Sequence, residues 1–300
     1  MARLRAPRFR GTLLCLAAGV AFAVSPVLIQ IAYRHGAAVS GVLAWRYLTA
    51  ALLLVGLAGR KLLAVPARAA VGAFVLGAAV YALDSALFFG SLERTSAPLA
   101  SLVHYAHLAL VVGVAAMSGR ERLTRRRLVA LMGIFGGVAL VGGAATNPDL
   151  VGVAMALGSA AAYAAYILLS DRLLRDSDPM ALAAYLTAGA ASTFLVAGGL
   201  LGSLGTVGGP AGLACLLGAA LVGSVFAVSS FLKGVRLVGP STASLLVTVE
   251  VAVTIALAAL ILKQQLTPTQ LAGAGLVVAA IVGMQLRRRP RRRRAVPATG

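Results

Sequence analysis

Long apolar runs, separated by short polar segments, follow one another along the whole chain. Each run is about 18 to 24 residues long, the length of a helix that crosses a hydrocarbon layer of ~30 Å at about 1.5 Å per residue. The pattern predicts an all-α polytopic membrane protein with ten transmembrane helices at residues 11–32, 39–59, 70–90, 97–117, 128–145, 151–170, 181–202, 211–232, 241–262 and 267–286.

The second half of the sequence resembles the first half at an offset of 143 residues. Ala100-Ser101-Leu102 returns as Ala243-Ser244-Leu245, and Leu123-Thr124 returns as Leu266-Thr267. A unit with an odd number of spans must place its copy upside down in the membrane, which is typical of alternating-access carriers. We therefore expect two inverted five-helix repeats at residues 1–146 and 147–286, and a basic cytoplasmic tail at 287–300.

The charges support this topology. The chain has 27 Lys and Arg against 8 Asp and Glu, a net charge of +19. With the N-terminus in the cytoplasm, every cation of the loops and the tail lies inside except Arg34, Arg94 and Lys263, as the positive-inside rule requires. Both termini are thus expected in the cytoplasm. The basic tail is interpreted as a topology anchor, with a patch for nucleic acid or anionic lipid as the alternative reading.

Composition and motifs argue against an enzyme. Hydrophobic residues make up 60% of the chain and charged residues 12%, against roughly 25% charged residues in soluble domains. The sequence has no His-Glu-x-x-His zinc motif, no Gly-x-Ser-x-Gly elbow and no phosphate-binding loop. Zinc needs three or four ligands, and His35 falls in an outer loop. We expect no catalytic residues, no metal and no cofactor.

Several short motifs resemble those of a known family. Leu92-Glu93-Arg94-Thr95-Ser96-Ala97-Pro98 and the later Gly119-Arg120-Glu121-Arg122-Leu123-Thr124 are similar to the first-half signature of the ten-helix EamA-type members of the drug/metabolite transporter superfamily. Ala44-Trp45-Arg46-Tyr47 resembles the second-helix arginine segment, and Val249-Glu250-Val251 the second-half signature. The chain departs from the pattern at Val251, where a proline is common, and at Gln264, where an acid is common.

The resemblance implies a location and an architecture. It implies a transporter of the bacterial cytoplasmic (inner) membrane. Spans 1–4 and 6–9 would surround a central pathway, and spans 5 and 10 would be peripheral. In span 5, Gly133 and Gly137 form a small-residue stripe that predicts a helix-packing face.

Polar side chains inside the spans are the candidate substrate-binding or coupling residues, because each is costly there. Arg46 is the only cation within a span, Asp84 and Glu250 are the only carboxylates, and His104 and His107 are three residues apart on one helix face. Counted along the helices, they lie roughly 9–15 Å deep, in one slab from the midplane outward. The candidate cavity aromatics are Trp45, Tyr47, Tyr81, Tyr105, Tyr163 and Tyr166.

Each candidate has a structural alternative. Arg46 fits either substrate binding or a structural ion pair, for which we expect Glu250 rather than Asp84 as the partner. The two carboxylates fit proton coupling, because changes in desolvation and in neighbouring charge shift a carboxyl pKa. The histidines fit pathway lining or simple interior hydrogen bonding, and the aromatics fit cavity lining, an interfacial belt or packing.

Three classes of function follow. The first is a secondary transporter, and the resemblance implies an exporter of small polar metabolites such as amino acids, with protons as a candidate coupling ion. The second is a lipid flippase or a non-catalytic membrane subunit. The third is an intramembrane hydrolase built on Asp84 and His104. The expected partners are the lipid bilayer and a small-molecule substrate, with no nucleic acid, in a monomer or homodimer.

Overall fold

The computed structural model describes residues 2–117, 125–143, 149–173, 177–238, 243, 246–247, 249–264 and 267–285. These residues form helices and short connections, and no strand occurs in the described part of the chain. The expected boundary between the repeats at 146/147 and the basic tail at 287–300 lie outside the described residues.

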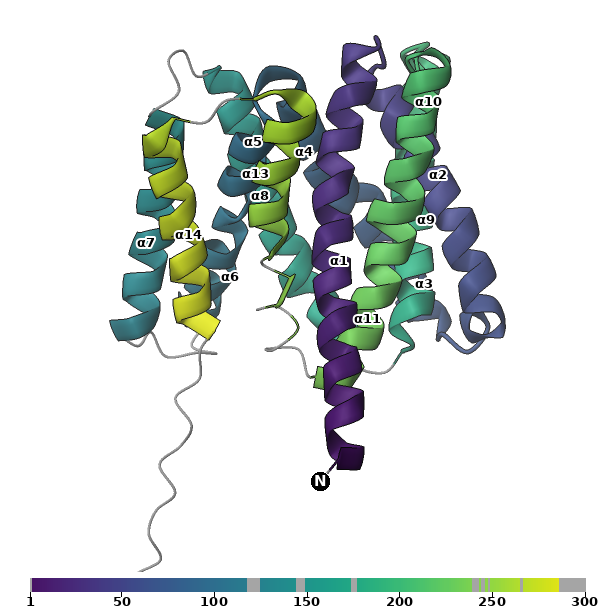
Figure 1. Cartoon of the computed structure of the whole chain (residues 1–300). Coiled ribbons are helices and arrows are strands. Elements are labelled where there is room, and N and C mark those ends of the chain that lie inside the picture. The colour runs from purple at the N-terminus through teal and green to yellow at the C-terminus, as the bar shows by residue number, and fades with distance from the viewer. Residues whose placement is uncertain are drawn as a thin grey trace, which may run out of the picture.

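Within the described residues, helices lie in every predicted apolar run (Figure 1), and the run at 97–117 is divided between two helices. In the first half they are α1 (Ala2–Arg34), α2 (Val39–Ala58), η1 (Gly59–Leu62), α3 (Ala67–Leu76), η2 (Gly77–Tyr81), α4 (Ala82–Arg94), α5 (Ala97–His104), α6 (Ala106–Met117) and α7 (Arg125–Gly143). In the second half they are α8 (Leu150–Leu173), α9 (Pro179–Leu200), α10 (Gly209–Gly218), η3 (Ala219–Phe226), α11 (Ala227–Val238), α13 (Val249–Leu262) and α14 (Pro268–Gln285).

Six of these helical segments are long and apolar enough to cross a membrane. They are Phe9–Arg34, Val39–Leu62, Ala67–Arg94, Leu150–Leu169, Pro179–Leu200 and Gly209–Gly234. Shorter apolar helices occupy Ala97–Val111, Leu128–Gly137, Val249–Leu262 and Pro268–Ala280. The architecture is therefore that of an all-helical membrane protein.

Two of the long helices contain a π-helical segment. In the first half η2 joins α3 to α4, and in the second half η3 joins α10 to α11. Residues 77–81 correspond to residues 220–224 at the offset of 143, so the two segments occupy equivalent places in the repeats. π-helical turns are rare and are frequent at functional sites.

Helix starts follow local sequence signals. The Ser96 hydroxyl accepts a hydrogen bond from the Leu99 N–H, and Pro98 lies in the first turn of α5. Asp178 caps α9 in the same way, accepting from the N–H groups of Met180 and Ala181. Each cap satisfies backbone donors that the first turn of a helix leaves free.

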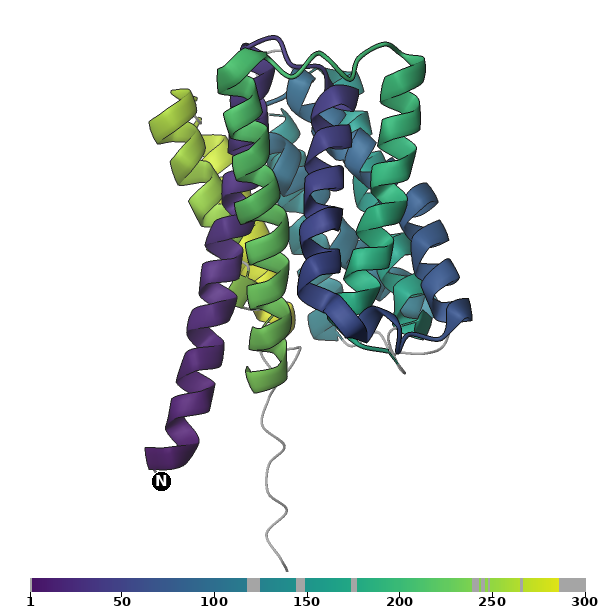
Figure 2. The ribbon, with the colours of Figure 1, turned by 90° about the vertical axis from the view of Figure 1, so that its right-hand side faces the viewer.

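Corresponding helices of the two halves pack against each other. Two pairs of corresponding helices are in contact, α2 with α9 and α7 with α14. Contacts between the halves also join α5 with α13, α1 with α10–η3–α11, and α8 with α3–η2–α4. Figure 2 shows α1 beside the long α10–α11 helix. The α1 and α8 contacts exchange under a two-fold relation between the halves, and the α2–α9 and α7–α14 pairs map onto themselves.

Contacts at the helix ends set the running directions. The Gln30 side chain near the end of α1 donates to the Thr95 carbonyl, directly after α4, so α1 and α4 end together. Arg94 pairs with Asp149, directly before α8, at 3.0 Å. Bonds from the Gly152 N–H and from Arg94 hold the pKa of Asp149 below its ordinary value. Hence α8 runs antiparallel to α1, its counterpart at the repeat offset.

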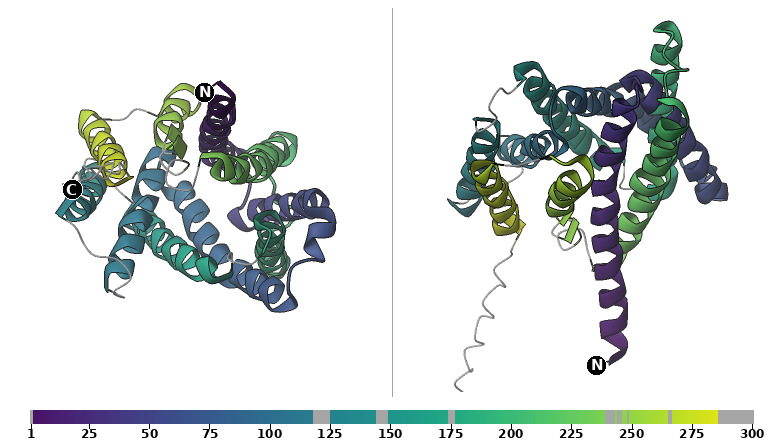
Figure 3. Two further views of the ribbon diagram at one scale, coloured as in Figure 1. Left: turned by 90° about the horizontal axis from the view of Figure 1, so that it is seen from below. Right: turned by 45° about the horizontal axis from the view of Figure 1, so that its top comes forward.

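α7 and α14 lie together at one edge of the bundle (Figures 1 and 3). A Cβ atom added at Gly137 would lie 2.6 Å from the Gly273 carbonyl oxygen, and one at Gly133 would lie 2.8 Å from the Ala280 Cβ. The predicted packing role of these two glycines is confirmed, because only a missing side chain allows such an approach.

Replacing Gly137 with alanine should therefore destabilise the protein by about 1–3 kcal/mol, because the added methyl group overpacks the α7–α14 contact. Gly136→Ala is the matched control. Its Cβ would meet only a Leu276 methyl at 3.8 Å, and alanine adds up to about 1 kcal/mol of helix propensity. Thermal unfolding of the purified variants in detergent measures the difference. Equal midpoints for the two variants would contradict the close contact.

Candidate functional site

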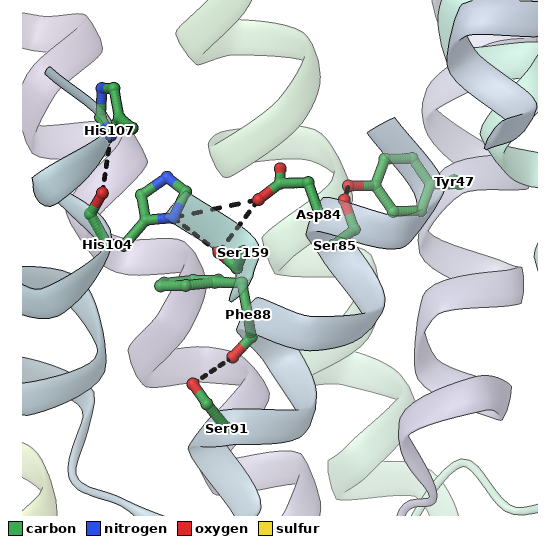
Figure 4. A network of polar contacts seen from close by, with 8 residues as sticks. All are labelled: Tyr47, Asp84, Ser85, Phe88, Ser91, His104, His107 and Ser159. Atoms are coloured by element: carbon green, nitrogen blue, oxygen red, sulfur yellow. Dashed lines mark hydrogen bonds and ion pairs between the residues drawn. The ribbon is translucent and has the colours of Figure 1, made fainter. Parts of the chain in front are cut away.

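Asp84, Ser159 and His104 form a hydrogen-bonded bridge between three helices (Figure 4). Asp84 lies on α4, directly after η2, and its Oδ1 accepts a hydrogen bond of 3.0 Å from the Ser159 hydroxyl on α8. The same hydroxyl is 2.7 Å from His104 Nδ1 on α5. Asp84 is 6% exposed and Ser159 is fully buried, so both depend on this bridge for their polar contacts.

The bridge can carry a proton in either direction. A hydroxyl has one proton and can accept at the same time. With Asp84 ionised, Ser159 donates to the carboxylate and His104 donates from Nδ1 to Ser159. With Asp84 protonated, both hydrogen bonds can reverse and His104 accepts at Nδ1. The protonation of Asp84 is therefore linked to the tautomer of His104.

The geometry is not that of a hydrolase. In a Ser-His-Asp triad, the serine and the carboxylate contact opposite ring nitrogens, so that the imidazole can take the serine proton. Here the Ser159 hydroxyl and the Asp84 carboxylate both face Nδ1 of His104, the latter at 3.9 Å. Ser159 therefore bridges two side chains instead of standing ready as a nucleophile.

His107 belongs to the same cluster because the helix is interrupted at Tyr105, between α5 and α6. The Leu108 N–H bonds to the Tyr105 carbonyl, which leaves the His104 carbonyl to accept 2.7 Å from His107 Nδ1. A carbonyl cannot donate, so the Nδ1 of His107 carries a proton in this arrangement. The rings of His104 and His107 are 5.0 Å apart.

Glu250 is held from the other half of the molecule. It is the second residue of α13, and its Oε2 accepts a hydrogen bond of 3.0 Å from the Tyr105 hydroxyl. Asp84 of the first half is likewise held by Ser159 of the second. Each intramembrane carboxylate therefore takes its hydroxyl partner from the opposite half.

An unbroken series of aromatic rings connects these groups. Neighbouring ring centroids are 4.8–5.7 Å apart along Phe194, Tyr47, Tyr81, Tyr166, Tyr163, His107 and Tyr105. Trp45 stands apart from the series. Its side chain is 39% exposed and its indole N–H donates to the Leu204 carbonyl at 2.8 Å.

The expected ion pair of Arg46 is wrong. Its guanidinium is 4.4 Å from the ring centroid of Phe89 and 5.3 Å from that of Tyr47, and neither intramembrane carboxylate forms a salt bridge with it. Helix depth indicated that Arg46 and Glu250 lie near one level, but their contacts depend on how each helix is rotated. Glu250 bonds to Tyr105 instead.

Sequence reasoning missed Ser159 and Ser85. Ser85 is buried and its hydroxyl is 2.6 Å from the Tyr47 hydroxyl. Both serines lie inside predicted apolar runs, which is a signal for a polar pathway, but serine in such a run is also a common packing residue. The two π-helical segments carry no compositional signal at all.

The comparisons with known proteins agree with this fold. The model of the EamA-like transporter family matches residues 9–143 and again residues 150–286. The uncharacterized transporter YcbK of Bacillus subtilis is 27% identical over 293 residues, which cover 93% of each chain. A crystal structure that is 18% identical superposes with a TM-score of 0.64 over 91% of this chain and 96% of the other, which supports the fold alone. With two copies of its family model in tandem, this chain belongs to the EamA-like transporter family.

Proposed function

We propose that this membrane transporter is a secondary active carrier that exports small polar metabolites such as amino acids by alternating access. One observation carries the proposal: each intramembrane carboxylate is held by a hydroxyl of the opposite half. A rearrangement of the halves would change the surroundings of both carboxylates at once, which is what coupling of a proton to a conformational change requires.

The proposed topology is ten crossings in two inverted repeats, at residues 1–146 and 147–286. The antiparallel course of α1 and α8, the pairing of corresponding helices and the matched π-helical segments support it. α1 begins and α14 ends at the same end of the bundle (Figure 1), as an even number of crossings requires. We propose that this end faces the cytoplasm of a bacterial inner membrane, because the expected inner loops carry most of the arginines.

The coupling mechanism uses the bridge at Asp84 and the bond at Glu250. A hydrogen bond to a carboxylate favours its charged form, and an apolar environment without that bond favours the neutral form. If the halves separate on one side, the contacts of Ser159 and Tyr105 with these carboxylates change, and so does the proton affinity of each site. Substrate movement and proton movement would then share one conformational step.

A lipid flippase or a non-catalytic subunit is the alternative. A flippase would need a pathway that opens sideways to the bilayer, whereas the polar groups described above are gathered between helices of both halves. That gathering favours a small polar solute. The cluster does not fit the proposed hydrolase, because Ser159 and Asp84 face the same nitrogen of His104.

The topology is tested with single cysteines in a protein that lacks Cys15 and Cys215. Met117, at the end of α6, is 90% exposed, and Lys263, directly after α13, is exposed. In the inverted arrangement these ends face opposite sides of the membrane. An impermeant thiol reagent added to intact cells should label Lys263→Cys and leave Met117→Cys unlabelled until the cells are opened. Labelling of both from outside would contradict the proposed topology.

The coupling is tested with Asp84→Asn and Glu250→Gln, which keep size and remove titration. In proteoliposomes, at least one variant should show a rate of pH-gradient-driven uptake that is lower by about tenfold or more. The same variant should still exchange substrate at equilibrium. Glu250 is the first choice, and His107 is the next residue to test.

Asp149→Asn is the matched control, because it removes a carboxylate that lies outside the spans and is paired with Arg94. It should transport as the unchanged protein does. Full gradient-driven transport by the Asp84→Asn/Glu250→Gln double variant would overturn the assignment of coupling to these carboxylates.

A further inference from the structure

Arg46 carries a buried charge in the interior of the bundle, and no salt bridge among the described residues neutralises it. Its side chain lies in the middle of α2, and the residue is 6% exposed. Its Nε and Nη1 atoms are buried and have no hydrogen-bond partner within the described part of the chain. Two donors of a permanently charged group are therefore left without an acceptor.

The surrounding side chains do not supply the missing acceptor. The faces of Phe89 and Tyr47 attract a cation but offer no lone pair to its N–H groups. The Tyr47 hydroxyl is engaged with Ser85, and Oδ1 of Asp84 is engaged with Ser159. The nearby Tyr33 hydroxyl donates to the Phe89 carbonyl. None of these nearby groups forms a hydrogen bond with Nε or Nη1 of Arg46 in the part of the chain that the structure describes.

A buried guanidinium without an acceptor is expensive, and in a membrane bundle such a group marks a pathway. Its planar fork matches a carboxylate, which can accept two parallel hydrogen bonds from it. The ring of Phe89 covers one face of the fork, so a ligand would approach along the edge. A small organic anion at one edge would supply a counter-charge and an acceptor for one of the two unpartnered nitrogens.

We propose that Arg46 is the subsite for the carboxylate of the transported substrate. This rests on the proposed function, because the ligand is taken to be the transported molecule. The substrates are then carboxylates and zwitterionic amino acids, and organic cations are rejected by the same charge. Asp84, close enough to Arg46 for an electrostatic interaction, offers the complementary charge to an ammonium group.

A purely structural arginine would behave differently. If Arg46 served only to hold the fold, its removal would lower stability whether or not a ligand is present. If it is an empty anion subsite, replacing it with an apolar side chain of similar length removes a buried charge that lacks a salt bridge and hydrogen bonds on Nε and Nη1. The ligand-free protein should then become more stable while it loses anion binding. Stability and binding therefore change in opposite directions.

The test uses the full chain purified in detergent at constant chloride concentration, with the thermal midpoint as the readout. The probes are propionate, propionamide, propylammonium and L-alanine. Propionate and L-alanine should raise the midpoint of the unchanged protein with concentration, and propionamide and propylammonium should not. Arg46→Met should have a higher midpoint without ligand and no response to propionate. Arg94→Gln, which removes an exposed arginine, should respond as the unchanged protein does.

Arg46→Lys keeps a point charge without the fork and should weaken the propionate response by about tenfold or more in concentration. If Arg46→Met does not fold, the lysine variant tests the proposal by itself. A propionate response of Arg46→Lys equal to that of the unchanged protein would then overturn the proposal. A lower midpoint of Arg46→Met together with an unchanged propionate response also overturns it. Anion binding could depend on Arg46 while the protein transports no substrate in liposomes. That result would contradict the proposed carrier function and would still support an anion site at Arg46.

Discussion

A buried carboxylate must find its hydrogen bonds within the protein, and this constraint ties the two halves of the molecule together. Asp84 takes its partner, Ser159, from the second half, and Glu250 takes its partner, Tyr105, from the first. In a low-dielectric interior such contacts are strong when formed and costly when lost. The polar cluster therefore joins the halves, and any movement between them must rearrange it.

The rest of the fold combines a close helix–helix contact with irregular turns inside two long helices. α7 and α14 pack closely at Gly137 and Gly273, at the edge of the bundle. The π-helical segments η2 and η3 lie inside the long helices that pack against α8 and α1. Because η2 ends directly before α4, a change in that turn would reorient Asp84.

Hydrophobicity was sufficient to predict an all-helical membrane fold and its six long apolar helices, because membrane spans are recognised by length and apolar composition. The close contact of Gly133 and Gly137 was also predictable, since small residues four apart lie on one helix face. The contacts within the polar cluster were not. Sequence gives the depth of Arg46, Asp84 and Glu250 along their helices, but the rotation and tilt of each helix decide which side chains meet.

The expected ion pair between Arg46 and Glu250 shows that equal depth along two helices does not predict a contact. Two opposite charges at one depth suggested a contact, whereas the structure gives Glu250 a tyrosine hydroxyl and leaves Arg46 between two aromatic rings. The sequence did not single out Ser159, because a serine in an apolar helix has many possible roles. Its position between Asp84 and His104 becomes informative only when three helices are seen together (Figure 4).

The central claim is that the halves alternate in opening, and the end of the bundle where α1 ends offers the most direct test. There the Gln264 side chain donates to Gln30 at 2.7 Å, which links α1 to the segment after α13. Cysteines at Gln30 and Gln264, in a protein without Cys15 and Cys215, can be joined by a short bifunctional thiol reagent with a reducible linker. The account predicts that transport in proteoliposomes stops on cross-linking and returns on reduction, while each single-cysteine protein is unaffected. Undiminished transport by the fully cross-linked protein would contradict alternating access between the two halves.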